Sequence, residues 1–183
     1  MKNSLKLMLL SGLLIFTACK KNTESSETTT STETTQATGQ SGVQDETSNP
    51  NIVQVAIGSK DHTTLVAAVK AAGLVDALSN AGPFTVFAPT NVAFDKLPKG
   101  TVEELVKPEN KEKLNDILGY HTYVGVLKTD YMQDGQEYEM VTPKKVKITK
   151  KDGKTFVNGY EIMASIETSN GIIHVINDVL LPK

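Results

Sequence analysis

The chain has 183 residues, with 19 basic and 21 acidic side chains and a formal net charge of −2. Every basic residue is lysine, so the chain lacks the arginine fork that binds phosphate or carboxylate through two parallel hydrogen bonds. This balance disfavours nucleic acid as a partner, because nucleic-acid-binding proteins gather cations on one face. The single cysteine, Cys19, excludes an internal disulfide and a cysteine-based zinc site.

The first 18 residues predict an export signal. Lys2 and Lys6 precede a largely apolar run over residues 7–16. This run is too short to span a membrane as a helix but suits a signal peptide. Two small residues then precede Cys19, an arrangement that resembles the lipobox of bacterial lipoproteins, whose cysteine is lipidated. We therefore expect a lipid anchor at Cys19, and the alternative is an ordinary signal peptide in which this cysteine has no role.

Residues 19–50 predict a lipidated cysteine followed by a disordered tether. Fourteen of the residues in 20–50 are serine or threonine, and too few are apolar to compensate for the conformational entropy of folding. A flexible coil of this length would separate its ends by roughly 30 Å. The segment is expected to act as a spacer, or as a linker with no role beyond its length.

Residues 51–183 are long enough to form one domain, and their first half predicts helices. Asp61 is expected to cap a helix that ends at Gly73, because the apolar residues between them recur at helical spacing. Thr90 or Asn91 is expected to cap the next helix.

The second half of this domain predicts strands. Its segments alternate in polarity or are rich in β-branched residues, and a shorter apolar strand is expected earlier, over residues 84–88. The pattern predicts a single α+β domain in which helices cover the apolar face of an antiparallel meander. Four dipeptides favoured in two-residue hairpins separate the segments: Asp134-Gly135, Asp152-Gly153, Asn158-Gly159 and Asn170-Gly171.

The domain shows no pattern typical of catalysis, and we predict no catalytic residue, cofactor or metal. Serine-nucleophile and phosphate-binding glycine motifs are absent from the sequence. The three histidines lack the local spacing of a metal site. His62 is expected to be exposed at a helix start, and His174 to neighbour the sheet. One catalytic alternative stays open, a hydrolase that would use His121 with Asp116 or Asp130.

His121 continues an apolar helical face that includes Leu114, in a helix predicted to start near Asn110. The first interpretation is a core histidine that is hydrogen-bonded to the backbone. The alternative is a recognition residue that acts together with Tyr120 and Tyr123.

A local group of lysines follows the helical half of the domain. Lys145 and Lys147 should share one face of a strand, opposite Val146 and Ile148. The group is interpreted as a solvated hairpin, or as a contact for a polyanion such as an acidic polysaccharide. Its members are Lys144, Lys145, Lys147, Lys150, Lys151 and Lys154.

Three segments together resemble the fasciclin (FAS1) domain family. Residues 85–94 (TVFAPTNVAF) are similar to its first signature, Tyr120-His121 to its central Tyr-His pair, and residues 170–182 (NGIIHVINDVLLP) to its second signature. Their order and spacing agree with the family, and the resemblance covers essentially all of residues 51–183. With the lipobox, the chain resembles a bacterial FAS1-domain lipoprotein.

The resemblance implies a β-sandwich wedge with helices packed along it, and an extracytoplasmic adhesion or interaction module without enzymatic activity. Animal members engage integrins and matrix proteins around the Tyr-His pair, which makes Tyr120 and His121 recognition candidates. We expect a protein lipid-anchored in the bacterial cell envelope, surface-exposed or periplasmic. Its expected partner is a matrix protein, a polysaccharide or a protein of another cell surface. The alternative is a periplasmic structural or assembly factor that acts on envelope partners.

Overall fold

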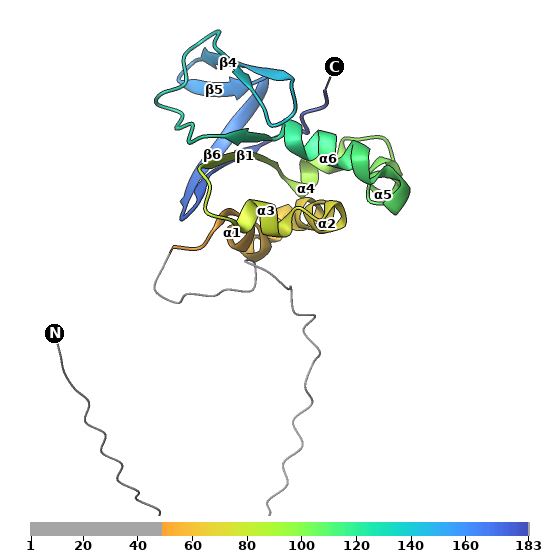
Figure 1. Ribbon diagram of the computed structural model, residues 1–183. Coiled ribbons are helices and arrows are strands. Elements are labelled where there is room, and N and C mark those ends of the chain that lie inside the picture. The colour runs from red at the N-terminus through yellow and green to blue at the C-terminus, as the bar shows by residue number, and fades with distance from the viewer. Residues whose placement is uncertain (1–48, 183) are drawn as a thin grey trace, which may run out of the picture. The chain divides into compact units, whose positions relative to one another are not determined.

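The computed structural model describes residues 49–182, so the predicted signal peptide, the lipid site at Cys19 and most of the tether lie outside the described residues. Helices dominate the first half of this part and strands the second half, as predicted (Figure 1). The helical elements are α1 (Ile52–Gly58), η2 (Lys60–His62), α2 (Thr63–Ala72), α3 (Val75–Ser79), α4 (Asn91–Asp95), α5 (Thr101–Leu105), η3 (Pro108–Asn110) and α6 (Lys111–Tyr120).

The strands form one seven-stranded sheet in the order β2-β1-β7-β6-β5-β4-β3. All neighbouring strands pair antiparallel except β1 and β7, which pair in parallel. The sheet coils so that its two ends approach, and the Val141 N–H donates to the Thr122 carbonyl at 2.8 Å. The strands are β1 (Phe84–Pro89), β2 (Thr122–Val124), β3 (Glu137–Glu139), β4 (Lys145–Lys151), β5 (Lys154–Val157), β6 (Tyr160–Thr168) and β7 (Gly171–Ile176).

Two hydrophobic cores lie on opposite faces of β1 and β7. Because both strands are covered on both faces, they appear in the sequence as nearly continuous apolar runs. Figure 1 shows α1, α2 and α3 on one side of β1 and the β4–β5 hairpin on the other. The helix-side core contains Ile52, Leu65, Ala68, Val69, Ala72, Val86, Ala88, Leu114, Leu118 and Ile173. The sheet-side core contains Phe87, Tyr120, Leu127, Met132, Met140, Val146, Ile148, Val157, Ile176 and Leu180.

This arrangement confirms the predicted α+β class, in which helices pack against a wedge-like, nearly closed sheet. The sequence did not predict that β1 would insert between β2 and β7. The parallel pairing depends on Gly171, because a Cβ at this position would lie 1.9 Å from the Phe84 carbonyl oxygen. No other residue could fit at that point without moving one of the two strands.

The predicted cap of α2 was wrong. Asp61 lies inside the short helix η2, and no side chain of the preceding residue caps α2. The Asn91 side chain performs this role from a distance, because its Oδ1 accepts from the Thr64 N–H at 3.0 Å and its amide donates to the Lys60 carbonyl. The helix ends at Gly73 as predicted, with φ of 74°. Thr90 caps α4, also as predicted.

The predicted dipeptides themselves form two-residue hairpin loops at two of the four places, and a third hairpin turns one residue earlier than predicted. Asp152-Gly153 and Asn158-Gly159 have positive φ at both residues, which matches the twist of the strands they connect. Asp134-Gly135 instead lies in a turn ahead of β3. At the last dipeptide, Ser169 and Asn170 form the turn and Gly171 already belongs to β7.

Candidate recognition surface

The Tyr-His pair lies at the end of α6, where the helix meets the sheet. His121 is 3% exposed and is held by two backbone groups. Its Nε2 accepts from the Leu180 N–H at 2.9 Å, so its Nδ1 carries the proton and donates to the Ile117 carbonyl at 2.8 Å. Burial lowers the pKa of His121 to about 4, which keeps the ring neutral at neutral pH. This geometry is that of the core histidine in the first interpretation.

Tyr120 is also buried, and its hydroxyl connects three elements. The hydroxyl donates to the Lys145 carbonyl of β4 at 2.9 Å and accepts from the Asn158 side-chain amide, also at 2.9 Å. Asn158 lies in the turn between β5 and β6, so α6, β4 and this turn are joined at one oxygen. Because Tyr120 is 5% exposed and His121 is 3% exposed, a partner that binds without rearrangement would contact little of either side chain.

Tyr123 is the one member of the predicted recognition group with an appreciably exposed side chain. It lies on β2 at one end of the sheet, and its ring packs edge-on against Tyr138 of β3, with centroids 5.7 Å apart. The contact crosses the seam where the coiled sheet nearly closes. The chain from β2 to just beyond β3 also carries exposed apolar side chains, which are Val124, Val126, Tyr131 and Val141.

The other two histidines are buried as well. The prediction that His62 is exposed was wrong, because η2 turns its ring inward, where Nδ1 lies 2.8 Å from the Ser59 hydroxyl. His174 in β7 is fully buried, as a neighbour of the sheet: its Nε2 donates to the Leu127 carbonyl and its Nδ1 accepts from the Ser165 hydroxyl. Burial lowers the pKa of both rings.

These contacts give the hydrolase alternative no support. Both ring nitrogens of His121 are occupied by backbone groups, which leaves neither available to a substrate or to a carboxylate. Asp116 and Asp130 are exposed. Within residues 49–182, no group of three metal-binding side chains could hold an ion.

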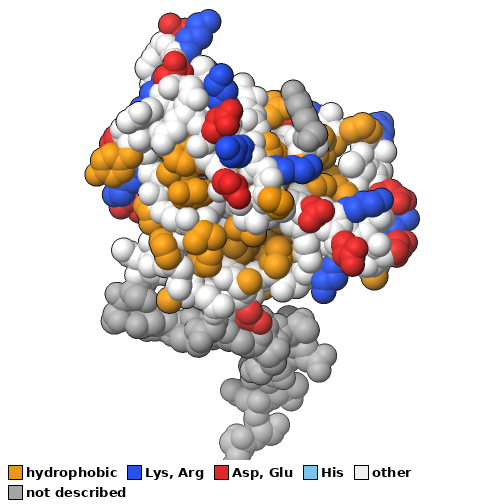
Figure 2. Space-filling model, turned by 45° about the horizontal axis from the view of Figure 1, so that its top comes forward, with side chains coloured by type: hydrophobic (Ala, Val, Ile, Leu, Met, Phe, Trp, Pro, Cys, Tyr) orange, Lys and Arg blue, Asp and Glu red, His pale blue; other side chains and the backbone are white. Residues whose placement is uncertain are grey.

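The predicted lysine face exists on β4. Val146 and Ile148 are completely buried, whereas Lys145 and Lys147 are exposed on the opposite face. Together with Lys144 they line a depression of about 550 Å³ at the end of the coiled sheet. In the upper part of Figure 2, lysine and acidic side chains lie next to one another.

Sequence reasoning missed two asparagines, which it interpreted only as turn residues. Asn158 joins the turn to β4, and the buried Asn170 joins three separate segments. The Asn170 Oδ1 accepts from the Ile52 N–H at 2.9 Å, and its amide donates to the Leu78 and Asn80 carbonyls. A turn dipeptide predicts backbone conformation but carries no signal for such distant partners.

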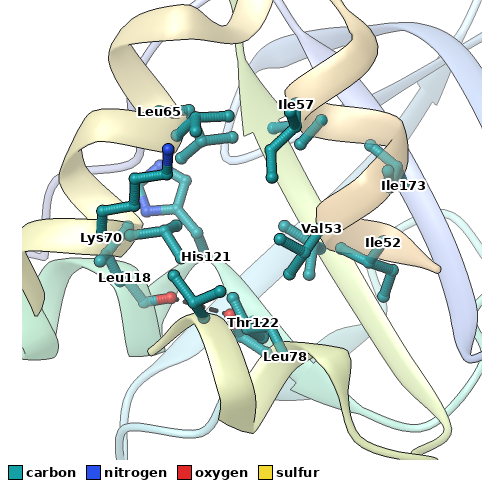
Figure 3. Close-up of a pocket in the computed structure, with 16 residues that line it drawn as sticks. Ile52, Val53, Ile57, Leu65, Lys70, Leu78, Leu118, His121, Thr122 and Ile173 are labelled. Carbon is teal, nitrogen blue, oxygen red and sulfur yellow. Dashed lines mark hydrogen bonds between the residues drawn. The ribbon is translucent and has the colours of Figure 1, made fainter. Parts of the chain in front are cut away.

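A small apolar cavity lies between the helices and β1, and His121 is among the residues around it (Figure 3). Its volume is about 30 Å³, and Val53, Leu65 and Thr122 are among the side chains around it. Thr122 donates its hydroxyl to the Leu118 carbonyl at 2.9 Å, and the surface of the cavity is almost entirely apolar. We interpret it as a packing defect of the helix-side core, because it is far smaller than ligand pockets of about 300–1,000 Å³.

The family model of the fasciclin domain matches residues 60–182. The chain belongs to the fasciclin family. Its FAS1 domain is 52% identical over 132 residues to Protein sll1483 of Synechocystis sp., a match that covers 72% of this chain and 73% of that protein. It is 43% identical to a second protein of that organism, Uncharacterized protein sll1735, over 72% of this chain and 98% of the other.

A solved structure supports the same fold. It is a FAS1 domain pair from the insect cell adhesion molecule Fasciclin I, which matches with a TM-score of 0.63 and 17% identity. The match covers 73% of this chain and 51% of the solved one, so this chain spans about half of that domain pair. Among residues 49–182, no helix is both long and apolar enough to span a bilayer.

Proposed function

We propose that this protein is a lipid-anchored adhesion module of the bacterial cell envelope. The observation that carries the proposal is the match of residues 60–182 to the fasciclin domain, a family that includes an insect cell adhesion molecule. The partner would be a matrix protein, a polysaccharide or a component of another cell surface. The FAS1 domain would bind this partner and would not transform it.

The chemistry of the domain supports a binding role. All three histidines are buried and hydrogen-bonded, so none is available as a general base at the surface. The exposed groups are instead of the kinds used in recognition. They include the aromatic ring of Tyr131, which is 72% exposed, and the lysines of β4.

The anchor would be supplied by the N-terminal part of the chain. Cys19 follows an export signal in a lipobox-like context, and the polar residues 20–50 would allow the domain to reach roughly 30 Å from the membrane. Two or more acyl chains on one cysteine would make that attachment stable. Cys19→Ala is therefore expected to release the protein from the membrane fraction while the FAS1 domain stays folded.

Attachment of cells tests the adhesive role directly. A deletion strain is expected to lose surface attachment and biofilm cohesion, and the wild-type gene is expected to restore both. Cys19→Ala serves as the matched control, because it removes the anchor and leaves the domain unchanged. Unchanged attachment in the deletion strain would contradict the proposal.

Protease treatment of intact cells then determines which side of the envelope the domain faces. A surface module should be cleaved from intact cells, while a periplasmic control protein survives. Protection in intact cells, with cleavage after permeabilisation, would favour a periplasmic structural or assembly factor instead.

A further inference from the structure

The lysine depression is lined by residues of α6, β3, β4 and the turn between β5 and β6. Its volume of about 550 Å³ is within the range of ligand sites, about 300–1,000 Å³. It is open to solvent and combines cationic, hydroxyl, amide and apolar groups. Its lining includes Tyr120, Glu137, Lys144, Lys145, Lys147, Asn158, Tyr160 and Leu181.

The charges of the depression are only partly neutralised. Lys144 and Lys147 form no ion pair with any residue in the described part of the chain. The Nζ atom of Lys145 lies 3.9 Å from Oε2 of Glu137, at the distance limit of an ion pair. Both side chains are exposed, so this ion pair is weak. Three lysines and one glutamate leave an excess of two positive charges in the lining.

The backbone beneath these lysines is held by hydrogen bonds to Tyr120 and to Asn158. Tyr120 donates to the Lys145 carbonyl, and the Asn158 side chain accepts from the Lys147 N–H at 2.8 Å. The Asn158 N–H in turn donates to the Lys147 carbonyl, also at 2.8 Å. A cationic surface built on a fixed backbone loses less entropy when a ligand binds.

We propose that this depression binds the uronate units of an acidic polysaccharide. The inference rests on the proposed adhesive function, because it names the chemistry that the adhesive domain would recognise. Lys144 and Lys147 would bind sugar carboxylates as charge-assisted donors. Glu137 would accept hydrogen bonds from sugar hydroxyls, and the apolar faces of Tyr160 and Leu181 would contact the sugar ring.

The same features disfavour a densely charged polyanion. Acidic side chains are interleaved with the lysines, since Glu137 and Glu139 lie opposite Lys147 and Lys145 in the β3–β4 register. The chain contains no arginine to hold phosphate through two parallel bonds. A glycan with one carboxylate per sugar and several hydroxyls matches this mixture better than a nucleic acid does.

Binding of the full chain, purified in detergent, to sodium alginate tests the proposal. Lys144→Gln/Lys147→Gln removes both unpaired charges of the depression. Lys150→Gln/Lys151→Gln is the matched control, because it removes two charges from β4 outside the depression. We expect the first pair to weaken alginate binding at least tenfold and the control pair to weaken it less than twofold.

Neutral dextran and a short DNA duplex are the comparison ligands, and circular dichroism verifies that each variant is folded. Weak binding of both ligands, relative to alginate, is expected. Equal losses in the two lysine pairs, equal binding of the DNA duplex, or no binding of alginate by the wild-type chain would each overturn the proposal. Cell attachment is measured separately. If the deletion strain loses attachment and the gene carrying Lys144→Gln/Lys147→Gln restores it, the proposed uronate site is wrong and the adhesive function stands.

Discussion

The Tyr-His pair and the lysines of β4 are neighbours in space, but their environments are opposite. Tyr120 and His121 are at most 5% exposed, and each of their polar atoms has a partner within the protein. The side chains of Lys145 and Lys147 are exposed, although Tyr120 is hydrogen-bonded to the backbone of one of them. Residues of a family signature can therefore hold a surface in place while contributing little exposed area to it.

Substitution of buried, hydrogen-bonded side chains should cost more stability than substitution of the exposed lysines. Among these buried side chains, Asn170 should be the most sensitive. Asn170→Ala removes the partner of the Ile52 N–H and of two carbonyls. Leaving these groups unsatisfied should lower the free energy of unfolding by about 3–5 kcal/mol. Urea unfolding measures this loss. The partly exposed Asn110, whose amide donates to the Glu104 carbonyl, offers the control Asn110→Ala. Equal losses of stability in Asn170→Ala and Asn110→Ala would contradict the structural role given to Asn170.

Acid should destabilise the domain through its buried histidines. Burial lowers the pKa of His121 from 6.5 to about 4, so the folded state binds this proton less readily than the unfolded state. The stability is therefore complete above pH 6.5 and decreases as the pH falls towards 4, by about 3 kcal/mol from this residue alone. His62 and His174, whose pKa values are also lowered, act in the same direction.

Urea unfolding between pH 7.5 and pH 4 measures this dependence. His121→Gln removes the titrating ring, so its stability should depend less on pH than that of the wild type. Identical pH profiles for the two proteins would show that His121 does not cause the loss.

Tyr120→Phe tests the connection between the two regions. The variant keeps the ring in the sheet-side core but removes the hydroxyl that bonds to Lys145 and Asn158. We expect a loss of about 1–2 kcal/mol in the free energy of unfolding, because two partly buried hydrogen bonds disappear. Alginate binding should weaken severalfold as the lysine-bearing backbone loosens. Weaker binding without any loss of stability would imply direct contact between the hydroxyl and the ligand.

Local pattern was sufficient to predict much of the fold. The helical spacing that ends at Gly73, the cap at Thr90 and the alternation at Val146 and Ile148 are determined by near neighbours in the chain. The place of β1 was not predictable in this way. It pairs with β2 and with β7, which follows it by more than 80 residues, and a short apolar run does not encode its partners.

The candidate site shows the same limit. The lysine face followed from strand alternation, but the role of Asn158 depends on atoms of α6 and β4 that only the fold brings together. His62 illustrates the opposite error. Its position next to a charged residue at a helix start indicated exposure, whereas the tertiary arrangement turned its ring inward.

The smallest expected effect concerns the cavity beside the buried pair. Val53 lines this cavity, and Val53→Ile adds one methylene group to it (Figure 3). Filling about 30 Å³ should raise the free energy of unfolding by about 0.7 kcal/mol, at about 24 cal/mol per Å³. Val92 is 67% exposed, so Val92→Ile adds the same group in solvent and should change little. Destabilisation by Val53→Ile would show that the core around His121 is already tightly packed, because overfilling costs stability.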